Sequence, residues 1–210
     1  MSQHYFVLQR PVEVMEEIKG SKFITLLFNA NSPDEFRAQL LLVKQQYPGA
    51  NHYCQAFIAS MPGDNASVGF SDDGEPSGSA GRPMLNVLLG ANIGFCGAIS
   101  VRYFGGTKLG VGGLVRAYSS GVKLAIAQAL LELRQPSEVI TLECSYSELG
   151  SVEHFCQRQQ LVIEDKHFSE QVSLKIQLPL SCINALCEQL KAINPMGVYI
   201  VRANSDSTQR

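Results

Sequence analysis

The chain has 210 residues, of which 45% are hydrophobic and 17% are charged, and its formal net charge is -2. This length suffices for one large domain or two small ones with packed cores. The near-neutral charge balance excludes a polybasic nucleic-acid arm and an acidic tail, so any polyanion partner must be met by a local patch.

The N-terminus and the cysteines indicate a cytoplasmic protein. The first ten residues lack the basic start and the apolar run of a secretory signal. The six cysteines are far apart and form no C-x-x-C pair, which predicts reduced, mostly buried thiols. Residues 83–101 contain no charged residue and are nearly long enough to span a membrane. Their asparagines and glycines instead predict a short helix, a turn and a buried strand, so we expect no membrane partner.

Strands and helices alternate through the first part of the chain. Ser32 followed by Pro33 predicts the N-cap and first position of a helix that ends at 47–49. The remaining predicted elements are a hairpin over 12–30, strands over 52–60, up to Phe70 and over 97–104, a short helix from Pro83 and a long helix over 113–133.

A break at residues 134–137 predicts a domain boundary, with one domain over 1–135 and a second over 136–210. The elements expected in the second domain are strand 138–146, helix 147–159, strands 160–166 and 171–178, helix 180–193 and strand 196–203. This βαββαβ order is the ferredoxin-like arrangement. The whole chain is therefore expected to be α+β, an α/β sandwich.

Glycine and charge single out the middle of the chain as the functional surface. Of 18 glycines, 15 lie between Gly49 and Gly121, which suggests that the backbone itself approaches a ligand. Two helix starts, at 81–83 and 112–113, offer free amides to an anion. The expected anion- or nucleic-acid-binding residues are Arg82, Arg102, Gly105, Gly106, Lys108, Gly112, Gly113, Arg116 and Lys123. Glycines that only make tight turns are the simpler alternative.

Acidic residues precede this basic region. Asp72, Asp73 and Glu75 could hold a divalent cation, form a solvated turn, or pair with Arg82 or Arg102. A solvated turn is the commoner arrangement, and we expect no metal and no cofactor.

One pair of side chains could do chemistry. His52 and Cys54 lie on one face of a predicted strand, as two metal ligands or a nucleophile and base would. A buried cysteine beside a structural histidine is the simpler interpretation.

Three segments make the chain resemble the bacterial YigZ branch of the IMPACT family. They are 50–54 (ANHYC), 70–85 (FSDDGEP continuing to AGRPML) and 101–110 (VRYFGGTKLG). The resemblance implies an N-terminal domain with the βα fold of the second domain of a small-subunit ribosomal protein. It also implies a ferredoxin-like C-terminal domain similar to that of elongation factor G, and a link to translation. It transfers no catalytic residue.

Three functions remain open. The favoured one is a non-enzymatic regulator of translation that binds RNA or the ribosome through the basic surface, with a translation-related protein as a further candidate partner. The second is an enzyme on a small phosphorylated or acyl substrate, with His52 as acid or base and Asp72, Asp73 and Glu75 as base or metal anchor. The third is an adaptor that binds a protein through the sheet of its second domain.

Overall fold

The computed structural model describes residues 4–64, 66–179 and 198–202, together with Ile183, Leu186 and Glu188. The chain divides into two compact units, one spanning Tyr5–Arg134 and the other containing the residues from Gln135 onward. Both units pack helices against antiparallel sheets, which confirms the α+β class.

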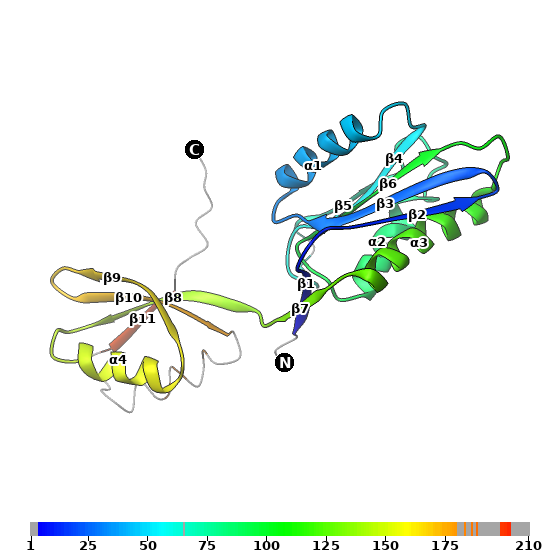
Figure 1. The fold of residues 1–210 in the computed structure, drawn as a ribbon. Coiled ribbons are helices and arrows are strands. Elements are labelled where there is room, and N and C mark those ends of the chain that lie inside the picture. Colours follow the sequence, from blue (N-terminus) through cyan, green and yellow to red (C-terminus); the bar gives the residue numbers. More distant parts are fainter. Residues whose placement is uncertain are drawn as a thin grey trace. The chain divides into compact units, whose positions relative to one another are not determined.

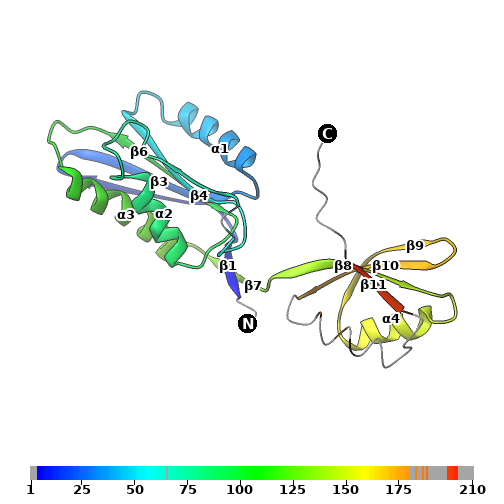
Figure 2. The same ribbon diagram turned by 180° about the vertical axis from the view of Figure 1, so that it is seen from behind.

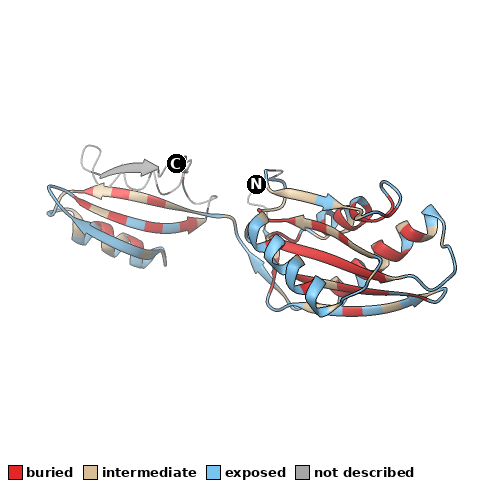
Figure 3. Ribbon diagram, turned by 90° about the horizontal axis from the view of Figure 1, so that it is seen from above, coloured by how far each residue is buried: buried red, intermediate tan, exposed pale blue. Residues whose placement is uncertain are grey.

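A five-stranded antiparallel sheet forms the centre of the first unit (Figure 1). Its order is β2-β3-β6-β4-β5. The strands are β2 (Val12–Ile18), β3 (Ser21–Asn29), β4 (His52–Ile58), β5 (Val68–Ser71) and β6 (Cys96–Tyr103). Strand β6 is buried along almost its whole length (Figure 3). Because both faces of β6 are covered, its polar residues Ser100 and Arg102 are buried as well.

Helices cover both faces of this sheet (Figures 1 and 2). Helix α1 (Pro33–Gln46) lies on one face, and α2 (Gly81–Gly90) and α3 (Val111–Gln128) lie side by side on the other. Strand β3 serves both cores, because Phe23 packs with the α2 and α3 residues and Ile24 with the α1 residues. Helix α1 begins as expected, with the Ser32 side chain accepting a hydrogen bond from the Glu35 amide.

The long helix predicted over 113–133 is wrong at its C-terminal end. Helix α3 ends at Gln128, and Ala129 is extended with φ -73° and ψ 138°. The following residues form β7 (Leu131–Arg134), which pairs antiparallel with β1 (Tyr5–Leu8), a strand not predicted from the sequence. Backbone pairing with β1 overrides the helical spacing of the leucines, and Leu130 is half exposed at 50%.

The uncharged stretch 83–101 folds as a helix, a turn and a buried strand, as expected. It contains most of α2, which begins at Gly81 rather than Pro83, and the first part of β6. No helix among the described residues combines the length and the apolarity needed to cross a membrane.

The second unit contains a four-stranded antiparallel sheet in the order β11-β8-β10-β9. Its elements are β8 (Ser137–Cys144), α4 (Leu149–Arg158), β9 (Val162–Phe168), β10 (Val172–Pro179) and β11 (Val198–Arg202). These agree with the predicted βαββαβ order. Most of the predicted helix 180–193 lies outside the described residues, but Ile183 and Leu186 are helical and buried in this core.

The four described cysteines are free and buried, in agreement with the expectation of reduced thiols; Cys182 and Cys187 lie outside the described residues. Burial raises the pKa of Cys54 and of Cys96 to about 12. Cys54 is therefore a protonated thiol near neutral pH and lacks the thiolate that a nucleophile or metal ligand needs.

Candidate functional site

Asp72 caps the N-terminus of α2. Its Oδ1 accepts hydrogen bonds from the amides of Ala80 (2.9 Å) and Gly81 (2.8 Å), and its Oδ2 accepts one from the amide of Gly78 (2.7 Å). The N-cap residue itself, Ala80, contributes no side-chain bond. The first of the two predicted anion-binding helix starts is thus already occupied by a carboxylate of the chain.

Asp73 attaches the loop that contains Asp72, Asp73 and Glu75, here called the acidic turn, to strand β4. Its Oδ2 accepts a hydrogen bond from the Tyr53 amide at 2.6 Å, and its backbone oxygen lies 2.8 Å from His52 Nδ1. A carbonyl oxygen can only accept, so Nδ1 carries the hydrogen, and in the neutral imidazole Nε2 is left with the lone pair. The thiol of Cys54 donates to the backbone oxygen of Asp72 at 3.1 Å. His52 and Cys54 therefore lie on one face of β4, as predicted, and both hold this loop.

Glu75 is buried and forms the centre of a polar cluster. Its Oε1 accepts hydrogen bonds from Arg102 Nη1 at 2.6 Å and from the Tyr118 hydroxyl at 2.7 Å. The expected pairing of the acidic turn with Arg82 or Arg102 is confirmed for Glu75 and Arg102. Burial raises the pKa of Tyr118 far above its ordinary value, so its hydroxyl remains a donor to Glu75.

The three carboxylates of the acidic turn thus point to three different sets of partners. The described residues contain no group of three or more His, Cys, Asp or Glu side chains arranged to hold a metal ion. The alternative of a cation at Asp72, Asp73 and Glu75 has no geometric support, because the oxygens do not converge on one point.

Arg102 differs from the other predicted cations. Its side chain is only 6% exposed, its charge is matched by Glu75, and its Nη2 lies 3.4 Å from Ser21 Oγ. The guanidinium also lies over the rings of Phe23 (5.3 Å) and Phe104 (5.6 Å). No hydrogen-bond partner for its Nε is found in the described part of the chain. Arg102 therefore organises the interior and does not reach a partner at the surface. The other predicted cations, Arg82, Lys108, Arg116 and Lys123, are all exposed.

A cavity of about 530 Å³, here called the His52 cavity, opens between the ends of β4 and β6, the acidic turn and the start of α3. It is lined by Asn51, His52, Glu75, Pro76, Arg102, Phe104, Lys108, Leu109, Gly110, Val111 and Leu114. The structure thus brings His52, Glu75, Arg102 and Lys108 together around one space. Asp72 and Asp73, proposed from the sequence for the same chemistry, do not line it.

The start of α3 is open, unlike that of α2. Its N-cap is Gly110, with φ 72° and ψ 163°, and no side chain caps the helix. The amide of Leu114 bonds to the Gly110 oxygen, so the amides of Val111, Gly112 and Gly113 precede the first intrahelical bond and are available to a ligand. Both predicted glycines, Gly112 and Gly113, therefore lie in this first turn.

The preceding loop passes tightly over the β2–β3 turn. A Cβ atom at Gly105 would lie 1.9 Å from the carbonyl carbon and oxygen of Gly20, so only glycine fits. The Gly105 amide already donates to Ser21 Oγ at 3.2 Å, and Gly106 adopts a positive φ of 86°. Gly105 and Gly106, predicted as anion-binding residues, allow the close backbone approach and the tight turn of this loop, which agrees with the simpler interpretation of the glycines.

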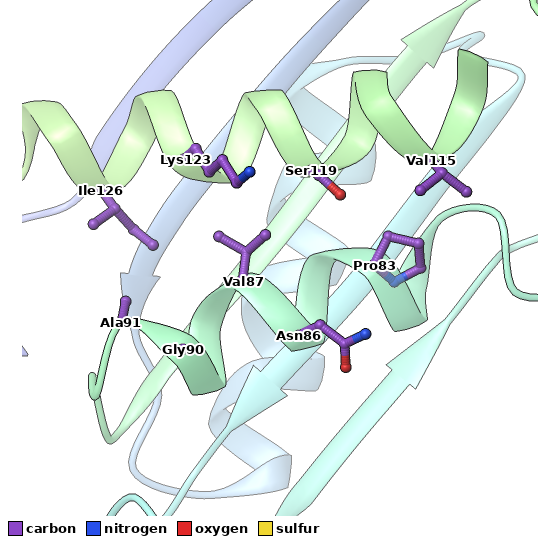
Figure 4. A pocket seen from close by; sticks show the side chains of 9 residues that line it. All are labelled: Pro83, Asn86, Val87, Gly90, Ala91, Val115, Ser119, Lys123 and Ile126. Atoms are coloured by element: carbon purple, nitrogen blue, oxygen red, sulfur yellow. The ribbon is translucent and has the colours of Figure 1, made fainter. Parts of the chain in front are cut away.

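A second hollow, the α2–α3 groove, has a volume of about 590 Å³ (Figure 4). It is lined by Pro83, Asn86, Val87, Gly90, Ala91, Val115, Ser119, Lys123 and Ile126. Arg116 and Lys123 lie seven residues apart, so they share the exposed ridge of α3.

Two members of the polar cluster, Ser21 and Tyr118, were not predicted as site residues. The spacing of Tyr118 with Leu114 and Val122 marks it as a core residue, which it is. The bond of its hydroxyl to Glu75, 43 residues earlier, depends on tertiary packing that helical periodicity does not report.

Comparison with protein families covers both units. Residues 19–126 match the Impact N-terminal domain family, and residues 142–193 match a family described as a domain of unknown function.

Three relatives align along most of their length. An IMPACT family member of Haemophilus influenzae is 39% identical over 186 residues, which cover 89% of this chain and 90% of the relative. The Escherichia coli IMPACT family member YigZ is 39% identical over 177 residues, covering 84% and 87%. The Bacillus subtilis IMPACT family member YvyE is 32% identical over 189 residues, covering 90% and 86%.

A solved structure described as that of a hypothetical protein resembles the chain with a TM-score of 0.72 and 34% identity. The match covers 98% of this chain and all of that one. It supports the two-unit α+β architecture, and its description states no activity.

Proposed function

The chain belongs to the IMPACT family, and from this premise, which supports a translation-regulator-like role, we propose that it binds RNA or the ribosome through the α2–α3 side of its first unit. The contact surface, here called the cationic face, consists of Arg82 on α2, Arg116 and Lys123 on α3, and Lys108 in the loop before α3. Its role is electrostatic attachment to the phosphate backbone.

The observation that carries the proposal is an absence of carboxylates. Residues 76–131 contain five lysines and arginines and no aspartate or glutamate. This segment includes α2 and α3 entirely, and both helices cover the same face of the sheet (Figure 1). The cations of the cationic face therefore have no compensating charge within their own helices, as a phosphate-binding surface requires.

The neighbouring strand β2 offsets little of the positive charge of the cationic face. Its side chains alternate across the sheet, and Glu13 interacts with Tyr47 on the α1 side. Glu16 points to the α3 side, where its Oε1 accepts a hydrogen bond from Ser120 at 3.0 Å. Strand β2 thus contributes one partly buried carboxylate, Glu16, to the side of the sheet that carries α2 and α3.

The polar side chains of the α2–α3 groove suit a ligand that is recognised by its shape and its phosphates, not by its base sequence. The α2–α3 groove offers Asn86, Ser119 and Lys123 as hydrogen-bonding groups along its two walls (Figure 4). Such groups suit phosphate and ribose hydroxyls, which carry little sequence information. We therefore expect strongly salt-dependent binding with weak sequence preference.

The test compares two triple variants with equal charge change. Arg82→Gln/Arg116→Gln/Lys123→Gln removes three cations from the cationic face. Lys22→Gln/Arg37→Gln/Lys44→Gln removes three exposed cations from β3 and α1, on the opposite face. Binding is measured by sedimentation with ribosomes and by gel shift on transfer and ribosomal RNA over a series of salt concentrations.

The first variant should make the negative slope of log affinity against log salt shallower by about 2–3, because each phosphate contact contributes roughly 0.7–0.9 to its magnitude. The second should leave that slope nearly unchanged. No RNA or ribosome binding by the folded wild type at low salt would overturn the proposal, and so would equal losses in the two variants.

A further inference from the structure

We propose that the His52 cavity is a second site, which shares only Lys108 with the cationic face, and that it binds a small organic phosphate monoester. The phosphate would lie at the open start of α3 beside Lys108. The organic part would lie against Phe104 and Leu114, and a hydroxyl group would donate to His52 Nε2. All of these residues line the same space.

The charge balance of the cavity favours an anion. Glu75 and Arg102 neutralise each other across 2.6 Å. What remains is the ammonium group of Lys108 and the uncapped first turn of α3 at Gly110 and Val111, with the positive end of the α3 dipole behind them. A tetrahedral phosphate can accept from several such donors at once.

Arg102 gives an independent sign of an unfilled polar site. Its side chain lines the cavity although it is only 6% exposed. Its Nε is the guanidinium donor for which the described residues supply no partner. A buried, charged donor left without a bond costs free energy, so the chain itself does not fully satisfy the guanidinium that lines the cavity.

Apolar side chains exposed around the opening indicate an organic ligand and not a free inorganic ion. Phe104 is 47% exposed and Val111 is 57% exposed, and both line the cavity with Leu109 and Leu114. Covering these surfaces removes apolar area from water. A volume of about 530 Å³ is in the usual range for small-molecule sites, about 300–1,000 Å³.

His52 adds an acceptor with a fixed orientation. The bond from Nδ1–H to the Asp73 carbonyl orients the ring and leaves the Nε2 lone pair at the cavity. Nε2 is 4.0 Å from Glu75 Oε1, too far for a hydrogen bond. A ligand hydroxyl can therefore donate to Nε2 without displacing an existing contact.

The probes are phenyl phosphate, inorganic phosphate and phenol, each titrated into the ¹⁵N-labelled full chain. Chemical-shift changes in two-dimensional NMR spectra report the site and the affinity. Phenyl phosphate should give saturable shifts at the amides of residues 110–113 and at His52, with weaker binding of inorganic phosphate and none of phenol. Equal affinity for phenyl phosphate and inorganic phosphate would overturn the organic class, and no saturable shift at residues 110–113 would overturn the site.

A matched pair of variants at Val111 separates binding from folding. Val111→Glu places a carboxylate at the exposed helix start, where it repels a phosphate but suits the helix dipole. Val111→Gln removes the same apolar side chain without adding a charge, so Val111→Glu should bind phenyl phosphate about tenfold or more weakly than Val111→Gln does. Equal binding by the two variants would contradict the proposal.

The RNA variant keeps the two proposals distinct. Arg82→Gln/Arg116→Gln/Lys123→Gln changes no residue that lines the His52 cavity. It should bind phenyl phosphate like wild type even if RNA binding is lost. Loss of phenyl phosphate binding in this variant would show that the probe contacts the cationic face, and would overturn a separate site.

Discussion

Helices α2 and α3 lie side by side on one face of the same sheet, but their N-termini differ. The start of α2 is closed by Asp72, which accepts three backbone hydrogen bonds. The start of α3 has no side-chain cap and no acidic residue in its first turn. Two glycine-rich helix starts that look alike in the sequence therefore differ in whether the chain supplies its own anion.

The acidic turn accounts for this difference. The carboxylates of Asp72 and Asp73 accept hydrogen bonds from backbone amides, and that of Glu75 accepts them from Tyr118 on α3 and from Arg102. None of the three caps α3. The same short turn thus caps the start of α2 and bonds to Tyr118 in the middle of α3, which leaves the start of α3 at Gly110 and Val111 uncapped beside the His52 cavity.

The largest expected effect comes from breaking the link between the acidic turn and α3. Glu75→Ala would leave the buried guanidinium of Arg102 without its counter-charge, and we expect a loss of about 3–5 kcal/mol in the free energy of unfolding of the first unit. Urea unfolding followed by probes in each unit measures this loss separately from the second unit.

A double variant checks the cause of that loss. Glu75→Leu/Arg102→Met replaces the ion pair by apolar side chains of similar size, so no buried charge is left unpaired. It should be clearly more stable than Glu75→Ala. A double variant that is no more stable than the single variant would show that the pair stabilises the fold by direct attraction instead.

The cap of α2 should give the next largest effect. Asp72→Ala removes the acceptor of three backbone amides, two of them at the start of α2, and should cost about 2–3 kcal/mol in urea unfolding. Asp72→Asn keeps one carbonyl acceptor and should cost roughly half as much. Equal stability of wild type and Asp72→Ala would mean that α2 does not depend on this cap.

Much of the first unit could be predicted because its signals are local. The Ser32 cap, the β2–β3 hairpin and the buried strand β6 each follow from residues that are adjacent in the sequence. The end of α3 could not be predicted in this way. Whether residues 131–134 continue a helix or form β7 depends on β1, more than 120 residues earlier.

The candidate site shows the same difference between features set by residues adjacent in the sequence and features set by tertiary packing. Positive residues and helix starts were visible in the sequence, and the pairing of the acidic turn with an arginine was one of three alternatives. The sequence did not show which cations are buried, because the burial of Arg102 and the exposure of Lys108 depend on tertiary packing. The use of the Asp72 carboxylate to close α2 also required the three-dimensional path of the turn.

Gly110 fixes the open start of α3 through its backbone conformation. With φ 72° and ψ 163° it occupies a region that only glycine adopts readily. Gly110→Ala should therefore cost about 1–2 kcal/mol in urea unfolding. Gly112→Ala is the matched control, because its φ is not positive and an added Cβ meets nothing within 4 Å. It should be neutral or stabilising by up to about 1 kcal/mol, and equal losses at both positions would rule out strain at Gly110.

The smallest effect tests the difference between the two helix starts directly. Val111→Glu adds a carboxylate to the uncapped first turn of α3 and should stabilise the fold by about 0.3–1 kcal/mol relative to Val111→Gln. Arg82→Glu adds one to the first turn of α2, where the Asp72 carboxylate already binds the amides. It should be no more stable than Arg82→Gln, because the two carboxylates repel each other. Thermal melts of the four variants at low ionic strength measure both differences. Equal gains at the two positions would mean that the start of α2 is as open to an anion as that of α3.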